Sequence, residues 1–184
     1  MNKKLLRYGA VFCMLLGIAT NATTAAESIL IDFELEDHAN TLHSASEWQG
    51  KTVVLFATSR EGQKHNEDYV WSAPIADFIA GLPASGEFAL ARIADLRIVP
   101  RLMRGMARGM TEDAGNPVPL VLTDWNGDFA QAYALDDSSY HLMVFDAQKK
   151  LVMHEALQTF DQQQLAAILV RLEAINSATI QPPP

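Results

Sequence analysis

One short stretch, Thr52-Val-Val-Leu-Phe-Ala57, sets the strongest limit on how this 184-residue chain can fold. It is a continuous apolar run rich in β-branched residues, which is typical of a strand covered on both faces. Other apolar segments predict an edge strand at the beginning and further strands later in the chain. The edge strand is expected at about 29–35, and the later strands at about 88–94, 117–123, 141–145 and 151–155.

Helical segments alternate with these strands. The spacing predicts a helix over residues 66–80 with Pro74 inside it, and a short helix over 128–135. A last helix begins after Asp161, which can cap it, and ends before a Pro-rich tail at 177–184. The alternation predicts an α/β fold, in which residues 27–176 form a single domain with a central mixed β-sheet flanked by helices on both faces.

The first 26 residues have the three parts of a secretory signal peptide: a basic start, an apolar middle and a small-residue end. We expect cleavage after Ala26 and a periplasmic location. The only cysteine, Cys13, lies in this segment, so the mature chain would have no thiol. Cleavage would also change the net charge from −8 to −11, which disfavours nucleic acid as a partner. No second apolar run is long enough to span a membrane, so we expect no transmembrane segment in the mature protein.

Three stretches resemble the redoxin-type proteins of the thioredoxin-like superfamily. They lie at 33–58, at 72–80 (Ser-Ala-Pro-Ile-Ala-Asp-Phe-Ile-Ala), and at 120–146. Within that superfamily the chain is similar to the YtfJ-like family of exported bacterial proteins. This similarity rests on Asn66, on Asp136-Asp137-Ser138-Ser139 and on the long segment between Ala94 and Asn116. The resemblance implies a single thioredoxin-like domain.

The resemblance also implies where a redox site would lie. In redox members a Cys-x-x-Cys pair stands where the first central strand meets the kinked helix. That position corresponds to Arg60 and Gln63, or to Asn66 and Tyr69, and neither pair contains cysteine. The position of the facing cis-proline corresponds to Tyr140.

We therefore expect a non-catalytic binding or accessory protein. It would hold a periplasmic partner or a small anionic ligand at the edge that corresponds to the redox site, and it would need no cofactor. The ligand-binding residues are predicted to be Ser59, Arg60, Gln63, Asn66 and Tyr140. The alternative implied by the resemblance is a thiol-disulfide oxidoreductase or a peroxiredoxin-like enzyme.

A segment after Pro100 combines arginines and methionines at helical spacing. Arg101, Arg104 and Arg108 share one face of a helix, and Met103, Met106 and Met110 share the opposite face. One hypothesis is that the three arginines bind a partner. The other is that the methionines pack on the body of the domain while the arginines are solvated or pair with its acids.

Metal binding is a further alternative, since the thioethers of the same methionines suit Cu(I). The five histidines show neither His-x-His nor an i, i+4 pair, so a histidine metal site would need the fold to bring them together. Asp124-x-Asn126-x-Asp128 is similar to the start of a calcium loop, but it lacks the downstream glutamate and is better explained as a turn.

Overall fold

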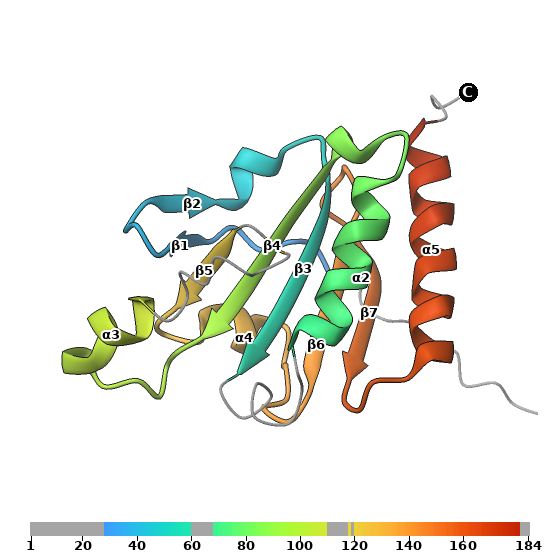
Figure 1. Ribbon diagram of the computed structural model, residues 1–184. Helices are drawn as coiled ribbons and strands as arrows, with labels where there is room; N and C mark the ends of the chain where they lie inside the picture. The colour runs from blue at the N-terminus through green and yellow to red at the C-terminus, as the bar shows by residue number, and fades with distance from the viewer. Residues whose placement is uncertain (1–27, 60–67, 110–117, 119, 181–184) are drawn as a thin grey trace, which may run out of the picture.

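The computed structural model describes residues 28–59, 68–109, 118 and 120–180. Within these residues the chain forms a seven-stranded sheet in the order β2-β1-β5-β4-β3-β6-β7 (Figure 1). The strands are β1 Glu34–Glu36, β2 Leu42–Ser44, β3 Thr52–Ser59, β4 Phe88–Asp95, β5 Val121–Asp124, β6 Tyr140–Phe145 and β7 Leu151–Leu157. The parallel pairs are β3–β4 and β4–β5, and the other pairs are antiparallel. The predicted mixed sheet is therefore confirmed.

Helices cover both faces of the sheet, as predicted. The α-helices are α2 Asp68–Ala80, α3 Arg104–Gly109, α4 Asp128–Ala132 and α5 Gln162–Ile180. Three short 3-10 helices are also present: η1 Ala45–Trp48, η2 Ser85–Glu87 and η3 Arg101–Met103. Figure 1 shows α2 and α5 on one face and α4 on the other, with α3 away from the centre of the sheet. Among the described helices, none combines the length and apolar character needed to cross a membrane.

The central strand β3 explains why both faces must be covered. Val54 and Phe56 pack into the core beneath α2 and α5, whereas Val53 and Leu55 pack into the core on the α4 face. All four side chains are almost completely buried. The apolar run that constrains the sequence most is thus a strand that both cores share.

The beginning of the chain differs from the prediction of one edge strand over residues 29–35. Ile29 forms an isolated bridge with Lys150, and the hydroxyl of Tyr133 accepts from the Ile31 N–H at 2.8 Å. The chain then forms β1, which lies between β2 and β5, so β2 and not β1 is the edge strand. The prediction was wrong because the alternation of side chains does not show which strand turns back outside another.

The last helix begins where the capping residue predicted it. The Asp161 carboxylate accepts from the backbone N–H of Gln163 at 2.7 Å and of Gln164 at 3.4 Å. The helix continues to Ile180, so the first four residues of the predicted tail are helical. The predicted signal peptide and residues 181–184 lie outside the described residues.

Candidate functional site

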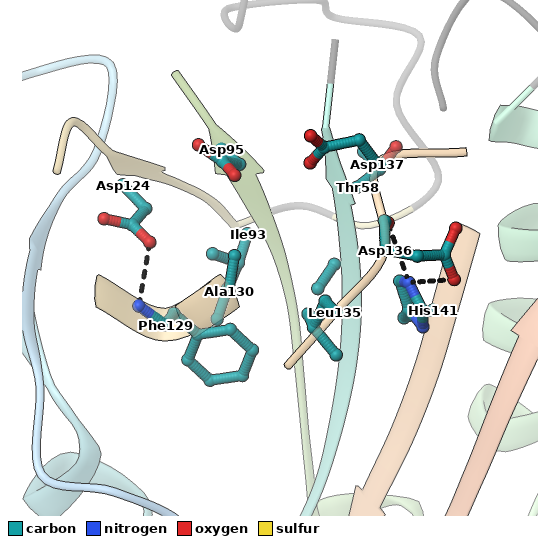
Figure 2. A pocket seen from close by; sticks show the side chains of 11 residues that line it. Thr58, Ile93, Asp95, Asp124, Phe129, Ala130, Leu135, Asp136, Asp137 and His141 are labelled. Carbon is teal, nitrogen blue, oxygen red and sulfur yellow. Dashed lines mark hydrogen bonds and ion pairs between the residues drawn. The ribbon is translucent and has the colours of Figure 1, made fainter. Parts of the chain in front are cut away.

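The carboxyl ends of the parallel strands meet at one edge of the sheet. Ser59 of β3 is in register with Asp95 of β4, and Asp95 is in register with Asp124 of β5. A small pocket, partly open to solvent, lies at this edge. Figure 2 shows its polar lining residues, which include Asp136 and Asp137 from the segment that leads into β6 and His141 of β6 itself. This edge is the candidate functional site.

Asp124 organises the turn that follows β5. Its Oδ1 accepts from the backbone N–H of Gly127 at 2.8 Å and of Asp128 at 3.1 Å, and its Oδ2 accepts from that of Phe129 at 2.9 Å. N–H groups at the start of a helix have no carbonyl partner within the helix, and the Asp124 carboxylate supplies the missing acceptor for α4. The buried carboxylate is therefore used by the backbone, which supports the turn interpretation of Asp124-x-Asn126-x-Asp128.

Arg97 links two carboxylates of the pocket. Its guanidinium lies 2.8 Å from Asp95 Oδ2 and 2.9 Å from Asp137 Oδ1. Burial raises the pKa of Asp95, and repulsion from Asp124 and Asp137 adds to this effect. The backbone N–H and the positive charge of Arg97 act in the opposite direction, but the pKa of Asp95 remains above its ordinary value.

His141 occupies the other side of the pocket. Its Nε2 lies 3.1 Å from the Asp136 carbonyl oxygen and 3.5 Å from Asp136 Oδ2 (Figure 2). Its Nδ1 lies 3.1 Å from Nε2 of His154 on β7. The Ser138 hydroxyl, which donates to Asp136, is the main reason why the pKa of Asp136 lies below its ordinary value despite partial burial. The polar groups on this side therefore contact one another.

The structure describes two of the five predicted ligand-binding residues. Ser59 ends β3, and Tyr140 begins β6 with its backbone in register with Thr58. Tyr140 is fully buried and stacks on Phe56, with ring centroids 5.8 Å apart. The other three predicted residues, Arg60, Gln63 and Asn66, lie outside the described residues. No peptide bond within the described segments is cis, including the one before Tyr140.

The arginine–methionine segment forms η3 and α3. Its described methionines face solvent, contrary to the hypothesis that they pack on the body of the domain. Met103 and Met106 are 49% and 67% exposed, so they do not pack on the body of the domain. The guanidinium of Arg104 lies over the Trp125 ring, 4.9 Å from its centroid. Arg108 lies 5.6 Å from the same centroid.

The same segment is tied to the domain by charge. Arg108 forms an ion pair with Glu36 of β1 at 2.5 Å, whereas Arg101 is exposed. The expected pairing of arginines with the domain's own acids is confirmed for Arg108. The packing expected of the methionines was wrong for Met103 and Met106, and Met110 lies outside the described residues.

Reasoning from the sequence missed the Arg97 bridge and the histidine pair. Arg97 contacts Asp137 across 40 positions of the chain, and no local pattern indicates such a contact. His141 and His154 were treated as scattered. A register for the predicted hairpin of β6 and β7 would have placed both on one face, since successive side chains alternate between the faces of a strand.

Known proteins resemble this chain in fold. No model of a known protein family matches the sequence, and no curated protein matches it. Among solved structures, the exposed lipoprotein thioredoxin Etrx1 of Streptococcus pneumoniae is similar, with a TM-score of 0.57 and 17% identity over 77% of this chain and 99% of that one. The thioredoxin domain of a thiol-disulfide oxidoreductase from Bacteroides vulgatus gives 0.54 and 14% identity, covering 80% and 97%.

An uncharacterised conserved protein from Geobacillus kaustophilus gives a TM-score of 0.60 and 16% identity, covering 86% of this chain and 85% of that one. Identities this low carry information about architecture only. The sheet order, the helices on both faces and these structural similarities agree. The chain has a thioredoxin-like α/β fold.

Proposed function

We propose that this protein is a non-catalytic binding protein of the periplasm that uses the carboxyl edge of its thioredoxin-like sheet to hold a partner protein. The observation that carries the proposal is the absence of cysteine at this edge. The only cysteine of the chain is Cys13, within the predicted signal peptide. Disulfide exchange and thiol peroxidase chemistry both need a thiolate nucleophile, and no other side chain replaces it.

The shape of the pocket supports a protein partner. The pocket is too small to enclose a small molecule, because the space in it that a water-sized sphere can occupy is only about 10 Å³, roughly the room for one water. It is also open to solvent. A shallow, accessible edge of this kind suits contact with a surface of another protein.

The charges at the described edge favour a basic group on that partner. Asp95, Asp136 and Asp137 carry three carboxylates, and Arg97 pairs with two of them, Asp95 and Asp137. A small anion would be repelled by this arrangement. The proposed anion site at Ser59, Arg60, Gln63 and Asn66 depends on a loop outside the described residues, and we keep it as the alternative ligand.

The proposal includes export to the periplasm and membership of the YtfJ-like family. The signal peptide predicted over residues 1–26 supports a periplasmic location, and the resemblance to the YtfJ-like family supports the same compartment. Both come from the sequence. The similarity to thiol-disulfide oxidoreductases keeps open the competing function of an enzyme, which the following experiment separates from binding.

The first measurement is redox activity of the exported protein, with the cleavage site verified by intact mass. We expect neither reduction of insulin disulfides nor peroxide consumption with a thiol donor above the rate of a heat-denatured sample. Catalytic turnover by thiol-free protein would contradict the proposal. The Cys13→Ala variant provides the matched control, because it should be exported and cleaved as the wild type is.

The second measurement locates the partner surface. A photo-crosslinking residue at Asp137, whose side chain is 59% exposed, should capture a distinct partner in the native periplasm. The same residue at Val170, which is 70% exposed on α5, is the control and should not capture it. Equal capture from both positions, or capture only from Val170, would show that the edge is not the binding surface.

A further inference from the structure

The fold brings together two histidines that are 13 positions apart. His141 lies on β6 and His154 on β7, and both point to the sheet face that carries α4, at diagonal positions across the antiparallel pair. Nδ1 of His141 and Nε2 of His154 are 3.1 Å apart. His141 is 3% exposed, whereas His154 reaches solvent on the edge strand. One imidazole is thus fixed in the core and the other is accessible.

Asp136 fixes which nitrogen of His141 is available. Its backbone carbonyl oxygen lies 3.1 Å from His141 Nε2. A carbonyl oxygen only accepts hydrogen bonds, so Nε2 carries the proton, and Nδ1 of the neutral ring holds a lone pair directed at His154. A histidine that ligates a metal usually donates its second N–H to a carbonyl or carboxylate in this way.

We propose that His141 and His154 bind a divalent late transition-metal ion, with Zn²⁺ and Cu²⁺ as the best-suited ions. Imidazole nitrogen is a ligand that these ions favour. A tetrahedral ion at about 2.0–2.1 Å from both nitrogens would hold them about 3.3 Å apart. The two nitrogens are already close to this separation. Because the ion would lie on the line between them, the exposed His154 ring has to swing its Nε2 sideways by about 2 Å to bind it.

Metal binding would move the ring proton of His154 from one nitrogen to the other. Without metal, His154 Nε2–H donates to His141 Nδ1. With metal, His154 carries its proton on Nδ1, and both facing nitrogens donate lone pairs to the ion. The described residues contain no group of three or more histidine, cysteine or carboxylate ligands. Water or a ligand from a partner would fill the remaining positions, so the affinity should be below that of a four-ligand structural zinc site.

The proposal is tested with Zn²⁺ alone on the exported protein. Isothermal titration calorimetry should show binding, and imidazole NMR signals of His141 and His154 should shift together with it. His154→Gln should weaken binding at least ~10-fold, as changes to the ligand surroundings of metal sites already do. The glutamine amide can still donate to His141 Nδ1, so the fold should be retained, which circular dichroism would verify.

His38→Gln is the matched control, since His38 is exposed on a different part of the surface and should leave Zn²⁺ affinity unchanged. Mg²⁺, which prefers oxygen ligands, should give no heat of binding. Absence of Zn²⁺ binding by the wild type, or equal binding by wild type and His154→Gln, would overturn the proposal. Loss of affinity in His38→Gln but not in His154→Gln would place the ion elsewhere and overturn it as well.

Discussion

Gly127 lies where the Arg97 bridge and the Asp124 turn meet. Its φ of +75° is a left-handed conformation, and an added Cβ would stand 2.7 Å from Arg97 Cδ. Alanine would therefore strain the backbone and displace the guanidinium that links Asp95 and Asp137. We expect Gly127→Ala to lower the free energy of unfolding by about 1–3 kcal/mol, measured by urea denaturation.

The matched control for this substitution is Gly86→Ala. Gly86 has no heavy atom within 4 Å of an added Cβ and no positive φ. We expect its substitution to change the free energy of unfolding by less than about 0.5 kcal/mol. If the two variants were equally stable, the Arg97 bridge and the left-handed turn would not be important for stability.

His43 makes stability depend on pH. Its Nδ1 lies 3.1 Å from Glu47 Oε2 and its Nε2 lies 3.2 Å from Asp37 Oδ2. Burial disfavours the charged ring, but the hydrogen bonds to Glu47 and Asp37 outweigh it and raise the pKa of His43. The raised pKa means that the folded state binds the proton more tightly than the unfolded state. The resulting stability is fully present below the unfolded value of about 6.5 and is lost as pH rises through the folded pKa.

We expect the wild type to lose more stability than His43→Gln between pH 5.5 and pH 8.5, by an amount of about 0.5–1 kcal/mol. Urea denaturation at several pH values measures the difference. The stability contribution of His154 has the opposite pH dependence, because burial and the charge of His141 lower the pKa of His154. This contribution is the same in both proteins, so the difference between the two pH profiles reports on His43. Parallel pH profiles of the two proteins would contradict the role of His43.

At the level of single residues, turns and helix starts could be predicted from the sequence, whereas contacts between residues far apart in the chain could not. Asn126-Gly127 indicates a turn because few residues other than glycine adopt positive φ readily. Asp161 indicates a helix start because its carboxylate binds N–H groups two and three residues ahead. The contact of His141 with His154 depends on strand register, which no local preference determines.

The helix α3 shows the same limit at the level of elements. Helical spacing correctly places Arg104 and Arg108 on one face, but spacing does not show which face meets the body of the domain. The Trp125 ring and the Glu36 carboxylate decide this, because they offer a guanidinium a cation–π contact and an ion pair. The apolar Met106 is consequently exposed.

These contacts predict unequal effects of the arginines on stability. Replacing both Arg104 and Arg108 by Gln should lower the free energy of unfolding by about 1–2 kcal/mol, because both contacts with Trp125 and the pair with Glu36 are lost. Arg101→Gln is the control and should be nearly neutral, since its side chain is exposed. Thermal denaturation measures both. An equal effect of the double variant and of Arg101→Gln would indicate that α3 is not anchored through Trp125.

For the whole molecule, the fold class was predictable because one buried strand requires two covering layers. The order of the strands was not, since the beginning of the chain contains both β1 inside the sheet and β2 at its edge. The candidate site was predictable as a place, the carboxyl edge of the central strands. Its chemistry was not, because Asp95, Arg97 and Asp137 meet only in the folded chain.

The same architecture predicts one cooperative unfolding transition. The two cores share β3, so loss of packing on one face should destabilise the other. Leu172 of α5 is fully buried beside the sheet, and Leu172→Ala should lower the free energy of unfolding by about 2–5 kcal/mol. Val170→Ala on the exposed side of α5 is the control, expected to cost less than about 0.5 kcal/mol.

Two tryptophans allow this cooperativity to be measured. Trp71 lies in the core beneath α2 and α5, and Trp48 lies in the core on the α4 face. In Leu172→Ala, fluorescence of variants that retain only Trp71 or only Trp48 should report the same shifted midpoint as far-UV circular dichroism. A lower midpoint for Trp71 alone would show that the α5 face unfolds independently. Coincident midpoints would follow from a single strand whose two sides belong to two cores, so that neither core persists without the other.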